Sequence, residues 1–204
     1  MPFEVRGEDR NQRPLVPALA LSPKTRPFRG VTSATKTLDP GEPLSDIGLY
    51  SLRFALVFAV LGVATGIYAG VRRQPEWTRV AERSVWIVFA FSSAAMLALF
   101  YALGTSDFSI AYVAAHSART MTLPYRLSAL WGGQAGSLLL WLWILAAYAA
   151  TAVWANRASN RNLMPWVVAI LLANAIFFLV LTNFVTNPFE RLPHTEVFSD
   201  GNGL

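Results

Sequence analysis

The sequence contains no cysteine, and only 14% of its residues carry a charge. The absence of cysteine excludes disulfide bonds and thiolate metal sites. The 17 lysine and arginine residues form no dense block, so the charge pattern does not indicate nucleic-acid binding. There is no Ser/His/Asp grouping, no phosphate-cradling glycine loop and no paired-carboxylate site. The sequence therefore offers no conventional catalytic centre.

What the sequence does contain is apolar residues, which make up 54% of the chain and give a mean hydropathy of +0.40. This composition is too apolar for an ordinary soluble domain, so we expect an all-α membrane protein. Residues 1–45 are polar and rich in Pro and Arg, and they predict a disordered tail before a membrane domain at 46–204. Apolar runs long enough to cross a bilayer predict about four transmembrane helices, at about 47–71, 85–103, 137–154 and 166–185.

Basic residues suggest which side each connection faces. Residues 72–84 and 155–165 read as short loops, and six arginines lie within them: Arg72, Arg73, Arg79, Arg83, Arg157 and Arg161. Because positive charge favours the cytoplasmic side, the segment 104–136 and the tail 186–204 are expected outside. The opposite side carries four basic residues near the span ends, Lys36, Arg119, Arg126 and Arg191, and six more in the N-terminal tail would resist translocation. The inverted topology is therefore the alternative.

Three features predict local structure. Gly62, Gly66 and Gly70 recur every four residues and form a smooth strip suited to close helix packing. Residues 108–113 alternate weakly between larger and smaller side chains, whereas Pro124 can open a short helix that leads into Trp131. Two asparagines in the last span, Asn174 and Asn183, are expected to bond to neighbouring helices rather than face lipid.

The most unusual stretch is 123–143, which reads LPYRLSALWGGQAGSLLLWLW. Three glycines, Gly132, Gly133 and Gly136, leave a helix entrance without side-chain bulk, so a partner backbone or a flat ligand can approach closely. Three indoles surround that gap: Trp131, Trp141 and Trp143. If the helix includes Gln134, one face carries Gln134, Ser137, Trp141 and Tyr148. The competing interpretation is a tight helix contact with an interfacial aromatic belt.

The string WGGQAGSLLLW, preceded by YVAAHS and LPYR and followed by NPFERLP and DGNGL, resembles the CcmF/NrfE family of cytochrome c haem lyases. The resemblance covers about residues 107–204. Two departures stand out: Ala135 occupies a position where the family usually has Glu, and the chain stops at Leu204, before the family's tryptophan-rich haem-handling signature and haem-ligating histidines. The chain is thus expected to be the front portion of such a protein, as a fragment or a split subunit, with the catalytic part beyond Leu204 or in a partner.

The resemblance implies a multi-pass protein of the cytoplasmic membrane whose motif region faces the periplasm or exterior. It also implies a part in covalent haem attachment to apocytochrome c, with haem as a transient substrate. The implied partners are apocytochrome c, other maturation subunits including a haem-carrying chaperone, and the lipid bilayer. Since the chain has no cysteine, it cannot itself be the haem acceptor.

The candidate residues for binding haem or a partner are Trp131, Gly132, Gly133, Gln134, Gly136, Ser137 and Trp141. His116 and His194 are the only histidines, and neutral imidazole can ligate haem iron. Neither lies in the motif that holds the family's haem ligands, and loop histidines are usually solvated or capping. The alternative functions are a membrane scaffold and a transport or assembly subunit without haem contact. A transporter should carry charged or unwound positions at mid-membrane, which these spans lack.

Overall fold

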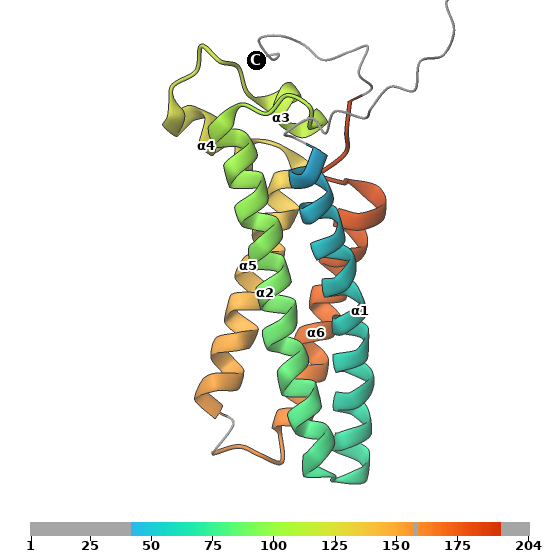
Figure 1. The fold of residues 1–204 in the computed structure, drawn as a ribbon. Coiled ribbons are helices and arrows are strands. Elements are labelled where there is room, and N and C mark those ends of the chain that lie inside the picture. The colour runs from blue at the N-terminus through green and yellow to red at the C-terminus, as the bar shows by residue number, and fades with distance from the viewer. Residues whose placement is uncertain (1–41, 157–158, 193–204) are drawn as a thin grey trace, which may run out of the picture. The chain divides into compact units, whose positions relative to one another are not determined.

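The computed structural model describes residues 42–156 and 159–192, all within one compact unit of the chain. Residues 42–45, expected in the tail, form the first turn of a helix; the rest of the tail and His194 lie outside the described residues. Figure 1 shows the arrangement of the helices. In chain order these are α1 Glu42–Arg72, α2 Pro75–Thr105, α3 Ala111–His116, α4 Leu123–Gly132, α5 Gln134–Asn156 and α6 Met164–Val180, followed by a π-helical segment, Leu181–Val185.

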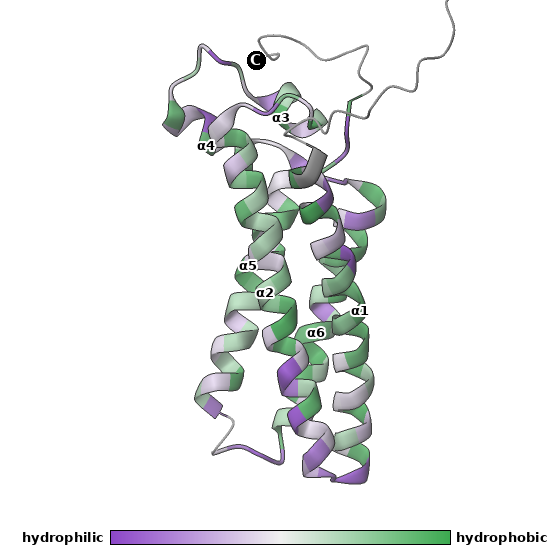
Figure 2. Ribbon diagram, viewed as in Figure 1, coloured by the Kyte–Doolittle hydropathy of each residue, from purple (hydrophilic) through white to green (hydrophobic). Residues whose placement is uncertain are grey.

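In the described ranges, four helices are long and apolar enough to cross a membrane, which confirms the predicted all-α membrane fold. Their membrane-compatible ranges are Leu44–Arg72, Pro75–Thr105, Gln134–Asn156 and Met164–Val185. The long helices form a ring in the order α1, α2, α5, α6 and back to α1, and α2 also contacts α6. Figure 2 shows apolar residues along the middle of these helices and polar residues gathered toward their ends.

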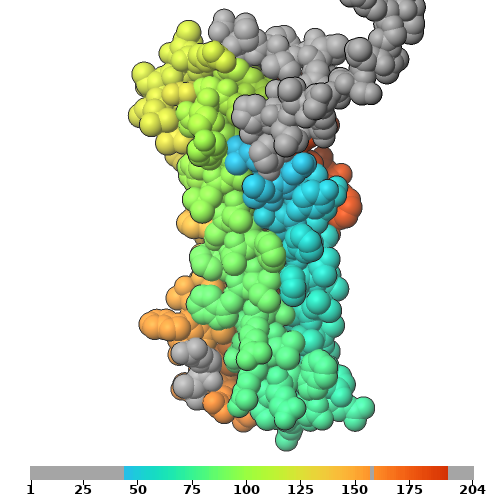
Figure 3. Space-filling view, viewed as in Figure 1, coloured from blue at the N-terminus to red at the C-terminus, as the bar shows by residue number. Residues whose placement is uncertain are grey.

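The expected loop at 72–84 is wrong, because α2 begins at Pro75 and leaves only Arg73 and Gln74 between the first two helices. Proline suits a first helical position, since its φ is preset and its missing N–H would have no partner there. Charged residues such as Arg79 interrupt the apolar run, yet they point outward while Ala81 packs inside. The side-by-side packing of α1 and α2 therefore continues to the end of the bundle where α1 ends and α2 begins (Figure 3).

The glycine strip of α1 packs against α6, as the strip's spacing predicts. A Cβ at Gly66 would lie 2.9 Å from the carbonyl oxygen of Pro165, and one at Gly70 would lie 2.6 Å from the Trp166 ring. At Gly62 a Cβ would overlap the side chain of Leu172. The strip therefore serves internal packing of this chain.

The two asparagines of the last span behave differently from each other. Asn183 reaches across to α1, where its amide lies 3.4 Å from the carbonyl oxygen of Leu52, and it also donates to Leu179 of its own helix. Asn174 is exposed, and within the described part of the chain it donates only to Ile170, one turn earlier in α6. The expected contact between helices is thus present at Asn183 and wrong for Asn174.

At one end of the bundle, the start of α3 is joined to residues 187–192 by backbone pairing, and α4 completes the layer beside α3. Ile110 forms an isolated antiparallel bridge with Arg191, and the amide of Ala111 donates to the carbonyl of Glu190 at 2.8 Å. Arg191 also forms an ion pair of 3.0 Å with Asp46 at the start of α1. The weakly alternating stretch 108–113 thus contributes one bridge residue and then turns into helix α3. We call this layer the platform.

Candidate binding site at the junction of α4 and α5

The motif WGGQAGS forms a sharp junction between two helices. Helix α4, with Pro124 in its first turn as expected, ends at Gly132; Gly133 is extended at φ −116° and ψ 159°, and α5 starts at Gln134. The last carbonyl groups of a helix have no partner within it. The hydroxyl of Ser137 lies 3.0 Å from the carbonyl oxygen of Trp131 and 2.8 Å from that of Gly133. Ser137 therefore holds the end of α4 against the start of α5.

Side chains of α3 fill the space beside two of the three glycines. A Cβ at Gly133 would lie 2.5 Å from Nε2 of His116 and 2.8 Å from the Tyr112 ring, and one at Gly136 would overlap both the carbonyl oxygen of Leu130 in α4 and the Tyr112 hydroxyl. Only Gly132 has open space beside it. The expected open entrance is therefore corrected: Gly133 and Gly136 accommodate this chain's own aromatic rings, because α3 folds back onto the junction.

Tyr112 of α3 contacts the end of α4 and stabilises the junction. Its hydroxyl donates to the carbonyl oxygen of Ala129 at 2.6 Å and lies 3.3 Å from that of Leu130, and its side chain is buried. Burial raises the pKa of the Tyr112 phenol, while the backbone amides of Gly133 and Gly136 act in the opposite direction. The neutral phenol can therefore serve as a hydrogen-bond donor inside the platform.

His116 stacks on Tyr112, with ring centroids 4.5 Å apart and planes inclined at 23°. Its Nδ1 lies 3.0 Å from the carbonyl oxygen of Tyr112; because a carbonyl can only accept, Nδ1 carries the proton. The other ring nitrogen, Nε2, faces Gly133. His116 is thus half-buried packing at the end of α3. The i, i+4 spacing of Tyr112 and His116 in YVAAH is the sequence signal for this pair, and sequence reasoning did not use it.

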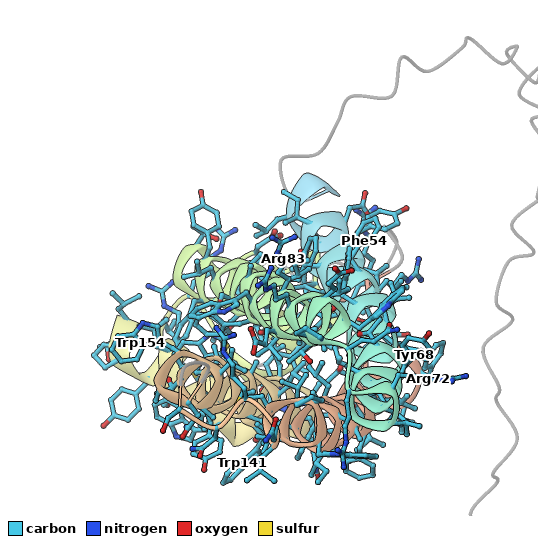
Figure 4. All side chains as sticks on the ribbon, turned by 90° about the horizontal axis from the view of Figure 1, so that it is seen from below. Phe54, Tyr68, Arg72, Arg83, Trp141 and Trp154 are labelled. Atoms are coloured by element: carbon cyan, nitrogen blue, oxygen red, sulfur yellow. The ribbon has the colours of Figure 1, made fainter. Side chains whose placement is uncertain are left out.

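The indoles at the two ends of the motif lie outside. Trp131 is 61% exposed and Trp141 is 59% exposed, and Figure 4 shows Trp141 on the outer surface of the bundle. Gln134 is exposed as well, seven residues before Trp141 on the same face of α5. Among the described residues, the Gln134 amide has no hydrogen-bond partner. Trp143 instead turns inward and donates to the hydroxyl of Ser93 on α2 at 3.0 Å.

A further contact anchors α4 to the end of α2. The guanidinium of Arg126 donates to the hydroxyl of Ser106, the residue that ends α2 with a left-handed φ of 56°. A positive charge at the C-terminal end of a helix is favourable because of the helix dipole. Sequence reasoning placed Arg126 only as an outer basic residue. Its role as a tether follows from the tertiary structure.

Within the described ranges, no group of three or more His, Asp or Glu side chains could hold a metal ion. The exposed part of the junction offers two indole faces and one free amide. Such groups bind flat apolar molecules and hydrogen-bonding groups rather than bare ions.

These features define a class: a multi-pass α-helical membrane protein that presents a rigid aromatic platform at one end of its bundle. Comparison with known proteins makes the assignment more specific. No family model matches the chain. The cytochrome c-type biogenesis protein CcmF of Haemophilus influenzae is 29% identical over 148 residues, which are 72% of this chain and 23% of that protein. CcmF of Pseudomonas aeruginosa is 32% identical over 162 residues, 79% of this chain and 24% of that protein.

A solved structure of the cytochrome c haem lyase CcmF matches with a TM-score of 0.65 and 28% identity, covering 81% of this chain and 27% of that one. The chain belongs to the CcmF/NrfE family of cytochrome c-type biogenesis proteins. It spans about a quarter of the length of the relatives it matches.

Proposed function

We propose that this chain takes part in cytochrome c maturation as a membrane part of a haem lyase assembly, and that its platform faces the outside of the cytoplasmic membrane. Two lines of support come from separate sources. The relatives are cytochrome c-type biogenesis proteins, and a solved relative is a haem lyase. The arginines at the other end of the bundle, including Arg72, Arg79 and Arg161, favour retention of that end in the cytoplasm.

The reaction joins apocytochrome to haem by adding each cysteine S–H across a haem vinyl group, which forms a thioether and leaves the hydrogen on the former vinyl group. Such an addition depends on holding the two reactants in position. In this proposal haem is a passing substrate, apocytochrome c and the haem-carrying subunit are partners, and this chain contributes orientation.

The observation that carries the proposal is that exposed indole rings flank a junction whose backbone is held by hydrogen bonds and ring packing. Trp131 and Trp141 offer flat apolar faces, and the free amide of Gln134 can donate to a haem propionate or to a partner backbone. Ser137, Tyr112 and His116 hold the junction in place. A preorganised surface of this kind loses little entropy on binding.

In this proposal the platform provides no iron ligand. Nε2 of His116, the nitrogen free to coordinate, faces the backbone at Gly133. The hydroxyl hydrogen of Ser137 is directed to carbonyl oxygens of the junction. Contact with haem would therefore come from ring stacking and from the Gln134 amide.

The test is cytochrome c maturation in cells, read by covalent haem staining, with Trp131→Ala and Trp141→Ala compared with Trp154→Ala. Trp154 is 63% exposed near the far end of α5, so it controls for loss of a surface indole. Losing one aromatic anchor should weaken binding about ten- to a hundredfold, by roughly 1–3 kcal/mol. We expect maturation to fall for the first two variants and to persist for Trp154→Ala.

Co-purification of haem with the assembly separates this function from a scaffold that never contacts haem. Under the proposal, the haem content per protein falls in Trp131→Ala and Trp141→Ala while assembly with partner subunits is retained. Equal maturation in all three variants would instead favour the scaffold, with the indoles forming an interfacial belt.

A further inference from the structure

A cavity of about 890 Å³ lies at the end of the bundle opposite the platform, where α1 ends and α2 and α6 begin. This end is at the bottom of Figure 1, and Figure 4 is viewed from it. The site is separate from the α4–α5 junction, and the inference rests on the proposed function for one point, the orientation that places this end of the bundle in the cytoplasm. It is lined by Ala69, Gly70, Val71, Arg73, Pro75, Thr78, Arg79, Glu82, Arg161, Asn162, Pro165 and Trp166.

Three exposed arginines from three separate segments line this cavity. Arg73 lies in the tight turn after α1, Arg79 in the second turn of α2, and Arg161 in the connection before α6. Glu82 is the one carboxylate in the lining, so three positive charges and one negative charge leave a net charge of +2. Among the described residues, no ion pair involves any of the three guanidinium groups. Collected positive charge of this kind attracts an anion.

Arginine also has suitable geometry for a phosphate. Its planar guanidinium presents parallel N–H groups that match two phosphate oxygens at once. Two neutral donors stand in the same lining: the Asn162 amide and the Trp166 indole, neither of which has a hydrogen-bond partner among the described residues. The lining of the cavity thus offers several hydrogen-bond donors of the kind that bind phosphate oxygens.

The position of the cavity in the bundle indicates whether its phosphate ligand would be a lipid headgroup or a dissolved anion. The cavity lies where the membrane-compatible ranges Leu44–Arg72 and Pro75–Thr105 meet, and helices of this length and composition would place such a point at the boundary of a bilayer. Tyr68 and Trp77, the sequence neighbours of the lining residues Ala69 and Thr78, pack edge to face with ring centroids 5.3 Å apart, and aromatic residues of this kind are common at membrane interfaces. Ala69, Val71 and Pro165 add apolar wall. This combination suits a lipid headgroup better than a freely dissolved ion.

We propose that the cavity binds the headgroup of an acidic phospholipid, and that its net charge and volume suit a lipid with two phosphates joined by a glycerol. Two phosphodiesters carry two negative charges, which balance the +2 of the lining. The volume is in the upper part of the range for small-molecule pockets, about 300–1,000 Å³. Basic pockets between transmembrane helices on the cytoplasmic side are suited to such headgroups. The bound lipid joins α1, α2 and α6 at the end that the arginines face.

The test uses the full chain purified in detergent and stripped of lipid. Lipid binding is titrated by native mass spectrometry and by the shift in melting temperature, with cardiolipin, phosphatidylglycerol, phosphatidylcholine and inorganic pyrophosphate as four separate probes. We expect cardiolipin to bind most tightly. Arg79→Gln/Arg161→Gln should weaken cardiolipin binding by about 25-fold, since each arginine near a membrane surface contributes about fivefold.

The matched control is Arg72→Gln/Arg83→Gln, which removes the same charge from the same end of the bundle without touching the lining. Both control residues are labelled in Figure 4. Equal loss of binding in the two double variants would overturn the proposal in favour of nonspecific attraction. Equal affinity for pyrophosphate and cardiolipin would overturn the lipid assignment and leave a site for free anions. If the double variant fails to fold, the single variant Arg161→Gln replaces it, because Arg161 lies in an exposed connection. This variant should weaken cardiolipin binding about fivefold.

Discussion

The hydroxyl of Tyr112 in α3 donates to the carbonyl oxygen of Ala129 in α4, 17 residues away in the sequence, at 2.6 Å. This bond ties the two short helices of the platform together, and its acceptor is one of the carbonyl groups at the end of α4 that α4 itself cannot pair. The tyrosine ring also fills the space beside Gly133 and Gly136. One side chain therefore decides both the position of α3 and the shape of the junction.

Replacement of Tyr112 by Phe should destabilise the protein, because the buried carbonyl of Ala129 loses its donor. The expected cost is about 1–3 kcal/mol in free energy of unfolding, measured by thermal or chemical unfolding in detergent. Tyr148→Phe is the matched control, since Tyr148 is 65% exposed on α5. Equal stability of the two variants would show that the bond contributes nothing.

The same bond predicts a dependence on alkaline pH. Burial raises the pKa of Tyr112 above its ordinary value of 10.0, so the folded state favours the neutral phenol. The stabilisation is therefore fully present below about pH 10 and is lost as the pH rises through the higher, folded-state pKa. The stability difference between the wild type and Tyr112→Phe should shrink in that range. A difference that grows with pH would contradict the sign of the shift.

The glycine strip predicts a position-specific effect of adding one methyl group. Gly66→Ala would bring a Cβ to 2.9 Å from the Pro165 carbonyl, which belongs to the backbone and cannot rotate away. We expect a loss of about 1–3 kcal/mol, as for overpacked cores. Gly104→Ala, at a helical glycine with nothing within 4 Å, should be neutral or stabilising by up to about 1 kcal/mol. Unfolding of the two variants in the same detergent makes the comparison.

The orientation of the bundle can be tested directly, since the chain has no cysteine of its own. Thr120→Cys places a thiol on an exposed part of the platform segment, and Ser159→Cys places one in the α5–α6 connection. We expect an impermeant maleimide added to intact cells to label position 120 and spare position 159, because positive charge in a connection favours the cytoplasmic side. Labelling of position 159 from outside would reverse the topology.

His116 allows packing and iron ligation to be distinguished. His116→Phe keeps a ring on Tyr112 and removes the nitrogen ligand, so covalent haem staining of cytochromes should persist. Gly133→Leu, which would drive a side chain into the His116 and Tyr112 rings, should impair maturation. If His116→Phe abolishes maturation while Gly133→Leu and Trp131→Ala leave it unchanged, iron ligation by His116 becomes the better account.

The amino-acid sequence by itself determined the four membrane helices and the strip on α1. Long uncharged runs must form helices in a bilayer because the backbone has no other hydrogen-bond partners there. Glycines four residues apart lie on one face whatever that face contacts, and Pro124 favours the start of a helix in any context. These properties depend on neighbours along the chain.

Only the tertiary structure decided where α2 begins, what fills the junction and how the arginines are grouped. Helix α2 continues back to Pro75 because its charged side chains turn away from a buried face that includes Ala81. Gly133 is closed because Tyr112 folds onto it from another helix. Arg73 and Arg161 are 88 positions apart, yet they line one cavity. Such contacts between distant segments depend on how the helices pack in space, which the spacing of residues along the chain does not specify.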